Sequence, residues 1–154
     1  MGENRPYYPI FLDLQDQRCV VVGGGTIGER KVKGLLDVGA YVVLISPEVT
    51  DGLARLGESG QIELVQRTFR KGDVEGAVLV FSATGSPEVN RRVAAEAGVN
   101  AVLLNSAEGS VAGDFILPSV FRQGALQVAL STGGGSPAYV RMVREWLEEI
   151  FGPE

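Results

Sequence analysis

One stretch decides the fold of this chain: Cys19-Val20-Val21-Val22-Gly23-Gly24-Gly25-Thr26-Ile27-Gly28-Glu29-Arg30-Lys31. An apolar run typical of a buried strand leads into the pattern Gly-x-Gly-x-x-Gly, and a helical pattern follows. In this order Gly23 permits a tight turn, Gly25 lets a ligand approach the backbone, and Gly28 lets the helix pack closely. The helix then offers free N–H groups to an anion. The stretch therefore predicts a site for a dinucleotide pyrophosphate, in preference to a plain strand-to-helix turn.

Strand and helix patterns alternate through the first two-thirds of the chain. Short runs rich in Val, Ile and Leu predict strands at 18–23, 41–46, 62–66, 77–82 and 101–105. Helical patterns lie between them, at 27–38, 50–57 and 87–97. Residues 70–75 fit either one helical turn or a loop. This alternation predicts an α/β fold, a Rossmann-type parallel sheet with helices on both faces.

Ligands of such sheets bind at the carboxyl ends of the strands. Three predicted loops, 23–28, 83–86 and 105–114, meet at that edge. No acid stands at Ile45-Ser46-Pro47, where it would bind a ribose hydroxyl, and no arginine follows at once, so these residues leave NAD and NADP open. We expect the cofactor to be bound by Gly23, Gly24, Gly25, Thr26, Ile27, Gly28, Ser46, Pro47, Ala83, Thr84 and Asn105.

The pattern changes after Asp114. Two apolar segments, 115–120 and 125–130, are separated by Phe121-Arg122-Gln123-Gly124, which predicts an antiparallel pair. A glycine-rich loop at 131–137 and an amphipathic helix at 138–151 follow. A hairpin and one helix cannot form a core of their own. We therefore expect this segment to pack on the first domain or on another subunit.

Composition excludes several classes of function. The net charge of −5, without a basic stretch, argues against general nucleic-acid binding. No apolar run reaches the ~20 residues of a membrane span, and the polar N-terminus lacks a signal-peptide core, so we expect a cytoplasmic protein. Cys19, the only cysteine, excludes an intrachain disulfide and is expected to be buried. The chain has no histidine, the commonest transition-metal ligand, and we expect no metal site.

Further motifs follow one another in a fixed order over residues 8–149. They are Pro9-Ile10-Phe11, Leu14, the glycine loop with Arg30-Lys31, Ala83-Thr84 with Asn90, Asn105, Phe115-Ile116-Leu117-Pro118-Ser119, Ser131-Thr132-Gly133-Gly134-Gly135-Ser136-Pro137, and Arg141 with Arg144-Glu145. With these motifs the chain resembles the precorrin-2 dehydrogenase module of sirohaem synthesis, which occurs alone or at the N-terminus of sirohaem synthases.

The resemblance implies a reaction, a cofactor and an assembly. It implies removal of two electrons and protons from precorrin-2, which gives sirohydrochlorin and NADH. It further implies an NAD-binding Rossmann domain at 1–113, a dimerisation segment at 114–154 that forms a homodimer, and a tetrapyrrole in the cleft. Iron chelation, which some members also perform, ranks lower because the chain lacks histidine and the longer C-terminus.

The resemblance also assigns residues to catalysis and substrate binding. An aspartate important in the family corresponds to Glu108, which keeps the carboxylate one methylene further out. Glu108 is the expected acid/base or substrate-orienting group, and Asp114 is the alternative. Thr132 matches a phosphorylatable serine of the family. The expected substrate-binding residues are Lys31, Ser131, Thr132, Gly133 and Ser136.

Alternatives remain for the loop and for the function. The loop at 131–137 offers N–H groups for a substrate carboxylate, and a flexible connector that caps the last helix carries equal weight. The first rival function is a non-catalytic NAD-sensing domain that regulates a partner. The second is a Rossmann reductase for another small substrate. Because all three functions need the phosphate loop, turnover of precorrin-2 is the observation that separates them.

Overall fold

The computed structural model describes residues 6–107 and 112–152. The chain divides into two compact units, Phe11–Phe115 and a second unit formed by Ile116–Glu154 with Met1–Ile10. Within the described ranges, no helix is both long and apolar enough to cross a membrane.

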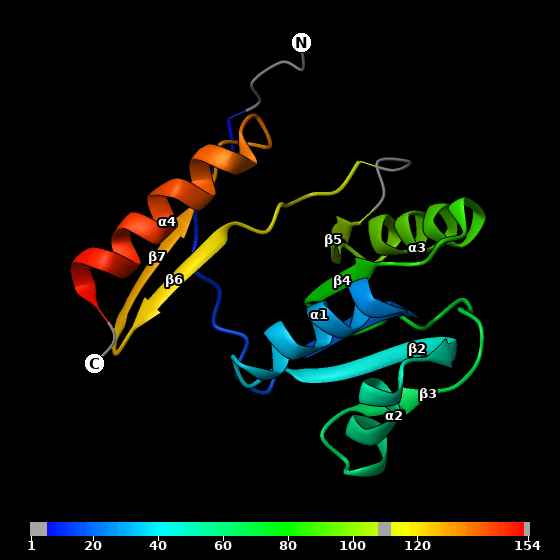
Figure 1. The fold of residues 1–154 in the computed structure, drawn as a ribbon. Helices are drawn as coiled ribbons and strands as arrows, with labels where there is room; N and C mark the ends of the chain where they lie inside the picture. Colours follow the sequence, from blue (N-terminus) through cyan, green and yellow to red (C-terminus); the bar gives the residue numbers. More distant parts are fainter. Residues whose placement is uncertain (1–5, 108–111, 153–154) are drawn as a thin grey trace. The chain divides into compact units, whose positions relative to one another are not determined.

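The unit Phe11–Phe115 is a five-stranded parallel sheet covered by helices (Figure 1). Its strand order, β3-β2-β1-β4-β5, is that of a doubly wound nucleotide-binding sheet. The predicted Rossmann-type architecture is therefore confirmed. The elements are β1 (Arg18–Gly24), α1 (Thr26–Leu36), β2 (Tyr41–Val49), α2 (Asp51–Glu58), β3 (Glu63–Val65), β4 (Leu79–Ser82), α3 (Pro87–Val99) and β5 (Leu103–Ser106).

The central strand β1 is buried on both faces. Cys19 and Val21 belong to a core cluster with residues of α1 and α2, whereas Val20 and Val22 belong to a second cluster with residues of α3. Parallel strands covered on both faces read as continuous apolar runs. This explains why the sequence of β1 does not alternate between apolar and polar residues.

The structure extends β2 beyond its predicted end. The pairing of β1 with β2 shifts after Val22, and Gly24 then pairs with Val49. This irregularity carries Ser46, Pro47 and Glu48 past the glycine loop as part of the strand. Residues 71–76 form turns, so the loop alternative holds for this segment.

The C-terminal unit contains an antiparallel pair, β6 (Ser119–Gln123) and β7 (Leu126–Leu130), and the helix α4 (Pro137–Phe151). The predicted pair is confirmed, but the predicted bounds of its first strand are wrong, because residues 121–123 belong to the strand and not to the connection. Pairing of Gln123 with Leu126 leaves a two-residue turn, in which Gly124 has φ +52°. A positive φ at this position suits the tight turns that join twisted strands.

Candidate functional site

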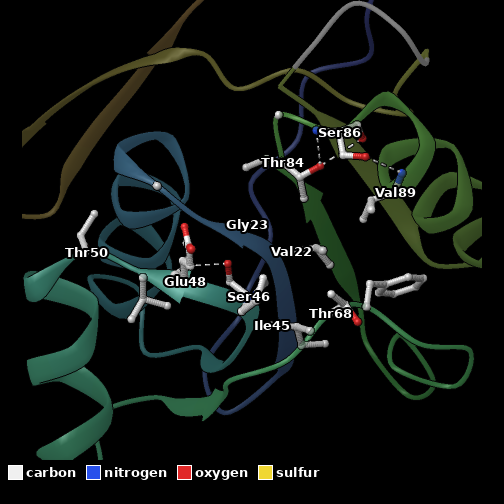
Figure 2. A pocket seen from close by; sticks show the side chains of 17 residues that line it. Val22, Gly23, Ile45, Ser46, Glu48, Thr50, Thr68, Thr84, Ser86 and Val89 are labelled. Atoms are coloured by element: carbon white, nitrogen blue, oxygen red, sulfur yellow. Dashed lines mark hydrogen bonds between the residues drawn. The ribbon is translucent and has the colours of Figure 1, made fainter.

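A cavity of about 640 Å³ lies at the carboxyl ends of β1, β2 and β4 (Figure 2). Its walls come from residues 22–25, 45–50 and 83–86, with Thr68 and Phe69 from the segment after β3. Small-molecule sites enclose roughly 300–1,000 Å³. Doubly wound sheets bind ligands at this place, where the order of strands reverses. Of the predicted cofactor residues, the cavity is lined by Gly23, Gly24, Gly25, Ser46, Pro47, Ala83 and Thr84.

The three fingerprint glycines have different surroundings. Gly23 has φ +117°, and a Cβ there would lie 2.3 Å from the carbonyl oxygen of Ala83. A Cβ on Gly28 would lie 2.0 Å from the carbonyl oxygen of Gly23. Thus the tight turn at Gly23 and the close helix packing at Gly28 are confirmed. A Cβ on Gly25 would meet nothing within 4 Å, so open space lies in front of this backbone.

Helix α1 begins beside this open space. Gly25 is its N-cap and provides no side-chain bond, and the first backbone bond runs from Glu29 N to Gly25 O at 2.9 Å. The N–H groups of Thr26, Ile27 and Gly28 therefore have no acceptor within the helix. Together with the positive end of the helix dipole, they suit a phosphate. The side chains of Thr26 and Ile27 are exposed, and neither residue lines the cavity wall.

The loop 83–86 is anchored by Asn90, which is fully buried on α3. The Ser82 hydroxyl donates to Asn90 Oδ1 at 2.6 Å, and Asn90 Nδ2 donates to Thr84 O at 3.0 Å. The Thr84 hydroxyl lies 2.7 Å from Asn90 Oδ1. Ser86 caps α3 by accepting from Val89 N at 3.4 Å. These bonds fix Ala83 and Thr84 in the cavity wall.

Glu48 is an acidic side chain of the cavity that the sequence did not predict. It is exposed on the extended part of β2, and the Ser46 hydroxyl donates to its carbonyl oxygen at 2.6 Å (Figure 2). None of the 17 described residues drawn around this cavity is lysine or arginine. The sequence Ser46-Pro47-Glu48 does contain an acid close to the predicted end of the second strand. It can be assigned to the cavity only when β2 is known to continue to Val49.

An ion pair holds the segment that brings Thr68 and Phe69 to the cavity. Arg67 donates to both oxygens of Asp73 at 2.8 Å, and Arg70 N donates to Asp73 Oδ2 at 2.7 Å. Burial of Asp73 disfavours its charge, but these bonds outweigh burial and lower the pKa of its carboxyl group. Asp73 therefore stays ionised near neutral pH and keeps the loop in place.

The structure places Asn105 and Lys31 outside this cavity wall. Asn105 is buried at the end of β5 and donates to Phe115 O at 3.0 Å. The ring of Phe115 packs edge-on against Phe81, with centroids 5.6 Å apart. Lys31 Nζ lies 5.8 Å from the centroid of Phe81. Burial, followed by the neighbouring charge of Arg30, lowers the pKa of Lys31.

The two candidate catalytic acids are placed differently. Asp114 Oδ2 accepts from Leu104 N at 2.9 Å, and Asp114 N donates to Leu104 O at 2.7 Å. Asp114 thus ties the chain after the 108–111 segment back to β5. Glu108 lies outside the described residues. Among the residues that the structure does describe, no three His, Cys, Asp or Glu side chains form a group suited to a metal ion.

The predicted substrate loop lies in the C-terminal unit. Thr132 Oγ1 accepts from Ser136 N at 2.9 Å, and Ser131 Oγ accepts from Gly133 N at 3.0 Å. Ser136 accepts from Tyr139 N at 3.3 Å and caps α4. This loop therefore has a helix-capping role, and within the described residues the hydroxyl groups of Ser131 and Thr132 accept hydrogen bonds but donate none.

Comparisons with known proteins agree with this arrangement. Residues 10–119 match the family model described as "Putative NAD(P)-binding", and residues 123–150 match "Sirohaem biosynthesis protein central". A solved structure, "SirC, precorrin-2 dehydrogenase", has a TM-score of 0.83 and 30% identity, and the match covers 95% of this chain and 72% of that one.

Two siroheme synthases are among the similar sequences. That of Chromobacterium violaceum is 37% identical over 145 residues, and that of Methylobacillus flagellatus is 40% identical over 143 residues. The matches cover 94% and 93% of this chain but 31% of each synthase. The chain thus spans about a third of the length of these curated relatives.

The strand order, the glycine loop and the cavity define a Rossmann-type NAD(P)-binding protein. Within that class, the chain belongs to the family of precorrin-2 dehydrogenases and sirohaem synthase NAD-binding modules.

Proposed function

We propose that this chain is an NAD-dependent dehydrogenase that converts precorrin-2 to sirohydrochlorin. The observation that carries the proposal is the cavity of about 640 Å³ beside the glycine loop, in a chain that aligns over 95% of its length with SirC. NAD⁺ held beside the glycine loop would supply the hydride acceptor, and the substrate would lose one proton besides the hydride. The protein's part is binding, orientation and electrostatics.

The cavity supports NAD in preference to NADP. The free N–H groups at the start of α1 suit the pyrophosphate, and the open space at Gly25 leaves room for it. The Glu48 carboxylate suits the ribose hydroxyls, because an acid near the end of the second strand accepts their hydrogen bonds. A 2′-phosphate would meet this negative charge without an arginine or lysine in the described wall.

The catalytic and substrate-binding assignments are part of the proposal. Glu108 is the proposed acid/base or orienting carboxylate, with Asp114 as the alternative. Asn105 is proposed to lie beside the nicotinamide. The tetrapyrrole is proposed to contact Lys31, Ser131, Thr132, Gly133 and Ser136.

Assembly and location complete the proposal. Helix α4 has no buried residue in the described chain, and Tyr139, Met142, Trp146 and Ile150 form an exposed stripe along it. We propose that a second copy covers this stripe. Sedimentation at micromolar concentration should give a homodimer, and a clean monomer would contradict it. A cytoplasmic location is also proposed, which suits a protein whose single cysteine is free and buried.

Turnover tests the function directly. The protein is mixed with precorrin-2 and NAD⁺, and the absorption spectra of sirohydrochlorin and NADH are followed. We expect both products to form in equal amounts. Binding of NAD without turnover would support the regulatory alternative. Omission of NAD⁺ and replacement by NADP⁺ are the controls for cofactor dependence.

A further inference from the structure

A second cavity, of about 390 Å³, lies entirely within the C-terminal unit. It is formed by the residues before β6, the end of β7, the loop that follows β7, and the first turns of α4. None of the ten described residues that line it is acidic, whereas two are arginines, Arg141 and Arg144. The cavity is therefore a positively charged place in a chain whose net charge is −5.

The two arginines share one face of α4, because residues three apart are neighbours on a helix surface. Arg141 forms no ion pair within the described part of the chain. Arg144 Nε lies 3.4 Å from Glu148 Oε1, but this nitrogen is buried and has no hydrogen-bond partner among the described residues. A guanidinium presents several donors in a planar fork that matches a carboxylate. Among the residues that the structure describes, most of these N–H donors have no acceptor.

Two hydroxyl groups face the same cavity from the loop. Ser131 and Thr132 both accept backbone bonds, from Gly133 and Ser136, and in the described chain neither hydroxyl donates one. Gly134, which also lines the cavity, has φ +91°, a conformation that favours glycine. The cavity thus combines the guanidinium groups of two arginines with two hydroxyl groups that donate no hydrogen bond within the described chain.

Apart from Ser119, the remaining wall has no polar side chain, and it includes Leu117, Leu130 and Val140. A free inorganic anion would make no favourable contact with such an apolar wall. A ligand with acidic side chains on a hydrophobic ring system would contact both the apolar wall and the arginines. We infer that this cavity is a carboxylate site, in which Arg141 and Arg144 hold an acidic side chain of a tetrapyrrole. The inference rests on the proposed function, and it adds the groups that supply the positive charge.

The test uses uroporphyrin, a stable porphyrin polycarboxylate, titrated into the full chain and followed by porphyrin fluorescence. Arg141→Gln and Arg144→Gln should each weaken binding by about tenfold, the scale of losing one charge-assisted hydrogen bond. Arg122→Gln is the matched control, because Arg122 is exposed on β6 of the same unit and does not line the cavity. Affinity for NAD, measured by calorimetry, should be unchanged in all three variants.

The outcomes separate this site from the proposed function. Equal binding of uroporphyrin by the wild type and both arginine variants, with circular dichroism unchanged, would overturn the carboxylate site. No binding by the wild type would overturn it as well. If inorganic pyrophosphate displaces the porphyrin where malonate at equal concentration does not, the site prefers phosphate and the assignment is wrong. Loss of binding in the variants, in a protein without precorrin-2 turnover, would keep the site and reject the dehydrogenase.

Discussion

Gly28 and Gly23 are in direct backbone contact: a Cβ on Gly28 would lie 2.0 Å from the carbonyl oxygen of Gly23. This contact joins the first turn of α1 to the end of β1. It fixes where the N-terminus of the helix points, because the helix cannot approach the strand so closely with any larger residue. Gly28 therefore acts through packing, whereas Gly25 faces open space.

Gly28→Ala should lower the free energy of unfolding by about 1–3 kcal/mol, the usual cost of overpacking. The added methyl group would meet backbone, which cannot rotate away. Gly34→Ala is the control on the same helix, because a Cβ there meets nothing within 4 Å. Alanine should stabilise α1 at that position by up to about 1 kcal/mol. Urea unfolding measures both, and equal stability of the two variants would contradict the contact.

Gly25→Val should abolish NAD binding and leave the fold intact. The valine side chain would occupy the open space before the N-terminus of α1, where the pyrophosphate is proposed to lie. The backbone φ of −79° at Gly25 is accessible to valine. Calorimetric titration gives the affinity, and circular dichroism checks the fold. Unchanged affinity in a folded variant would mean that the phosphate lies elsewhere.

Local sequence pattern predicted the strands and helices of the first unit because each is fixed by its own apolar residues. The first strand of the hairpin was predicted too early in the chain, because residues 115–120 form an apolar run. Pro118 within this run has no N–H group to pair with a neighbouring strand. The strand accordingly begins at Ser119. The apolar content of residues 115–120 predicted a strand but not its bounds, and Leu117 and Val120 of this segment are exposed in the structure.

The cofactor site was predicted in part. The features that the sequence did not predict depend on contacts between residues that lie far apart in the chain. Glu48 reaches the cavity through a register shift between β1 and β2, which no local pattern reveals. Phe69 depends on the ion pair between Arg67 and Asp73. Asn105 stands at the expected strand end, but its amide bonds to Phe115 O, a contact that only the folded chain defines.

Asn90→Ala should lower both stability and NAD affinity. The truncation removes the partner of the Ser82 hydroxyl and the donor to Thr84 O, and leaves buried polar groups unsatisfied. Such a loss costs about 1–3 kcal/mol. The loop 83–86 should then move in the cavity wall and weaken NAD binding. Asn100→Ala, at the exposed C-cap of α3, is the control and should change stability less and NAD affinity not at all.

Glu48→Gln should narrow the preference for NAD over NADP. Glutamine keeps the size and an acceptor but removes the charge that repels a 2′-phosphate. We expect NAD to bind up to about tenfold more weakly, the loss expected for a charge-assisted hydrogen bond, and NADP to bind more tightly. Glu58→Gln, exposed at the end of α2 and outside the cavity wall, is the matched control. An unchanged ratio of the two affinities would remove Glu48 from cofactor selection.

Glu108→Gln tests the proposed catalytic carboxylate, since it keeps the size of the side chain and removes its charge. If Glu108 transfers a proton or orients the substrate, kcat should fall by roughly 10²-fold or more, the scale of losing a proton-transfer group. NAD affinity should change little, because Glu108 follows β5 and not the phosphate loop. Asp114→Asn is the comparison, with urea unfolding alongside, because Asp114 also bonds to Leu104 N. If Glu108→Gln is active and a folded Asp114→Asn is not, the role belongs to Asp114. If both are active, water or the substrate's own carboxylates move the proton.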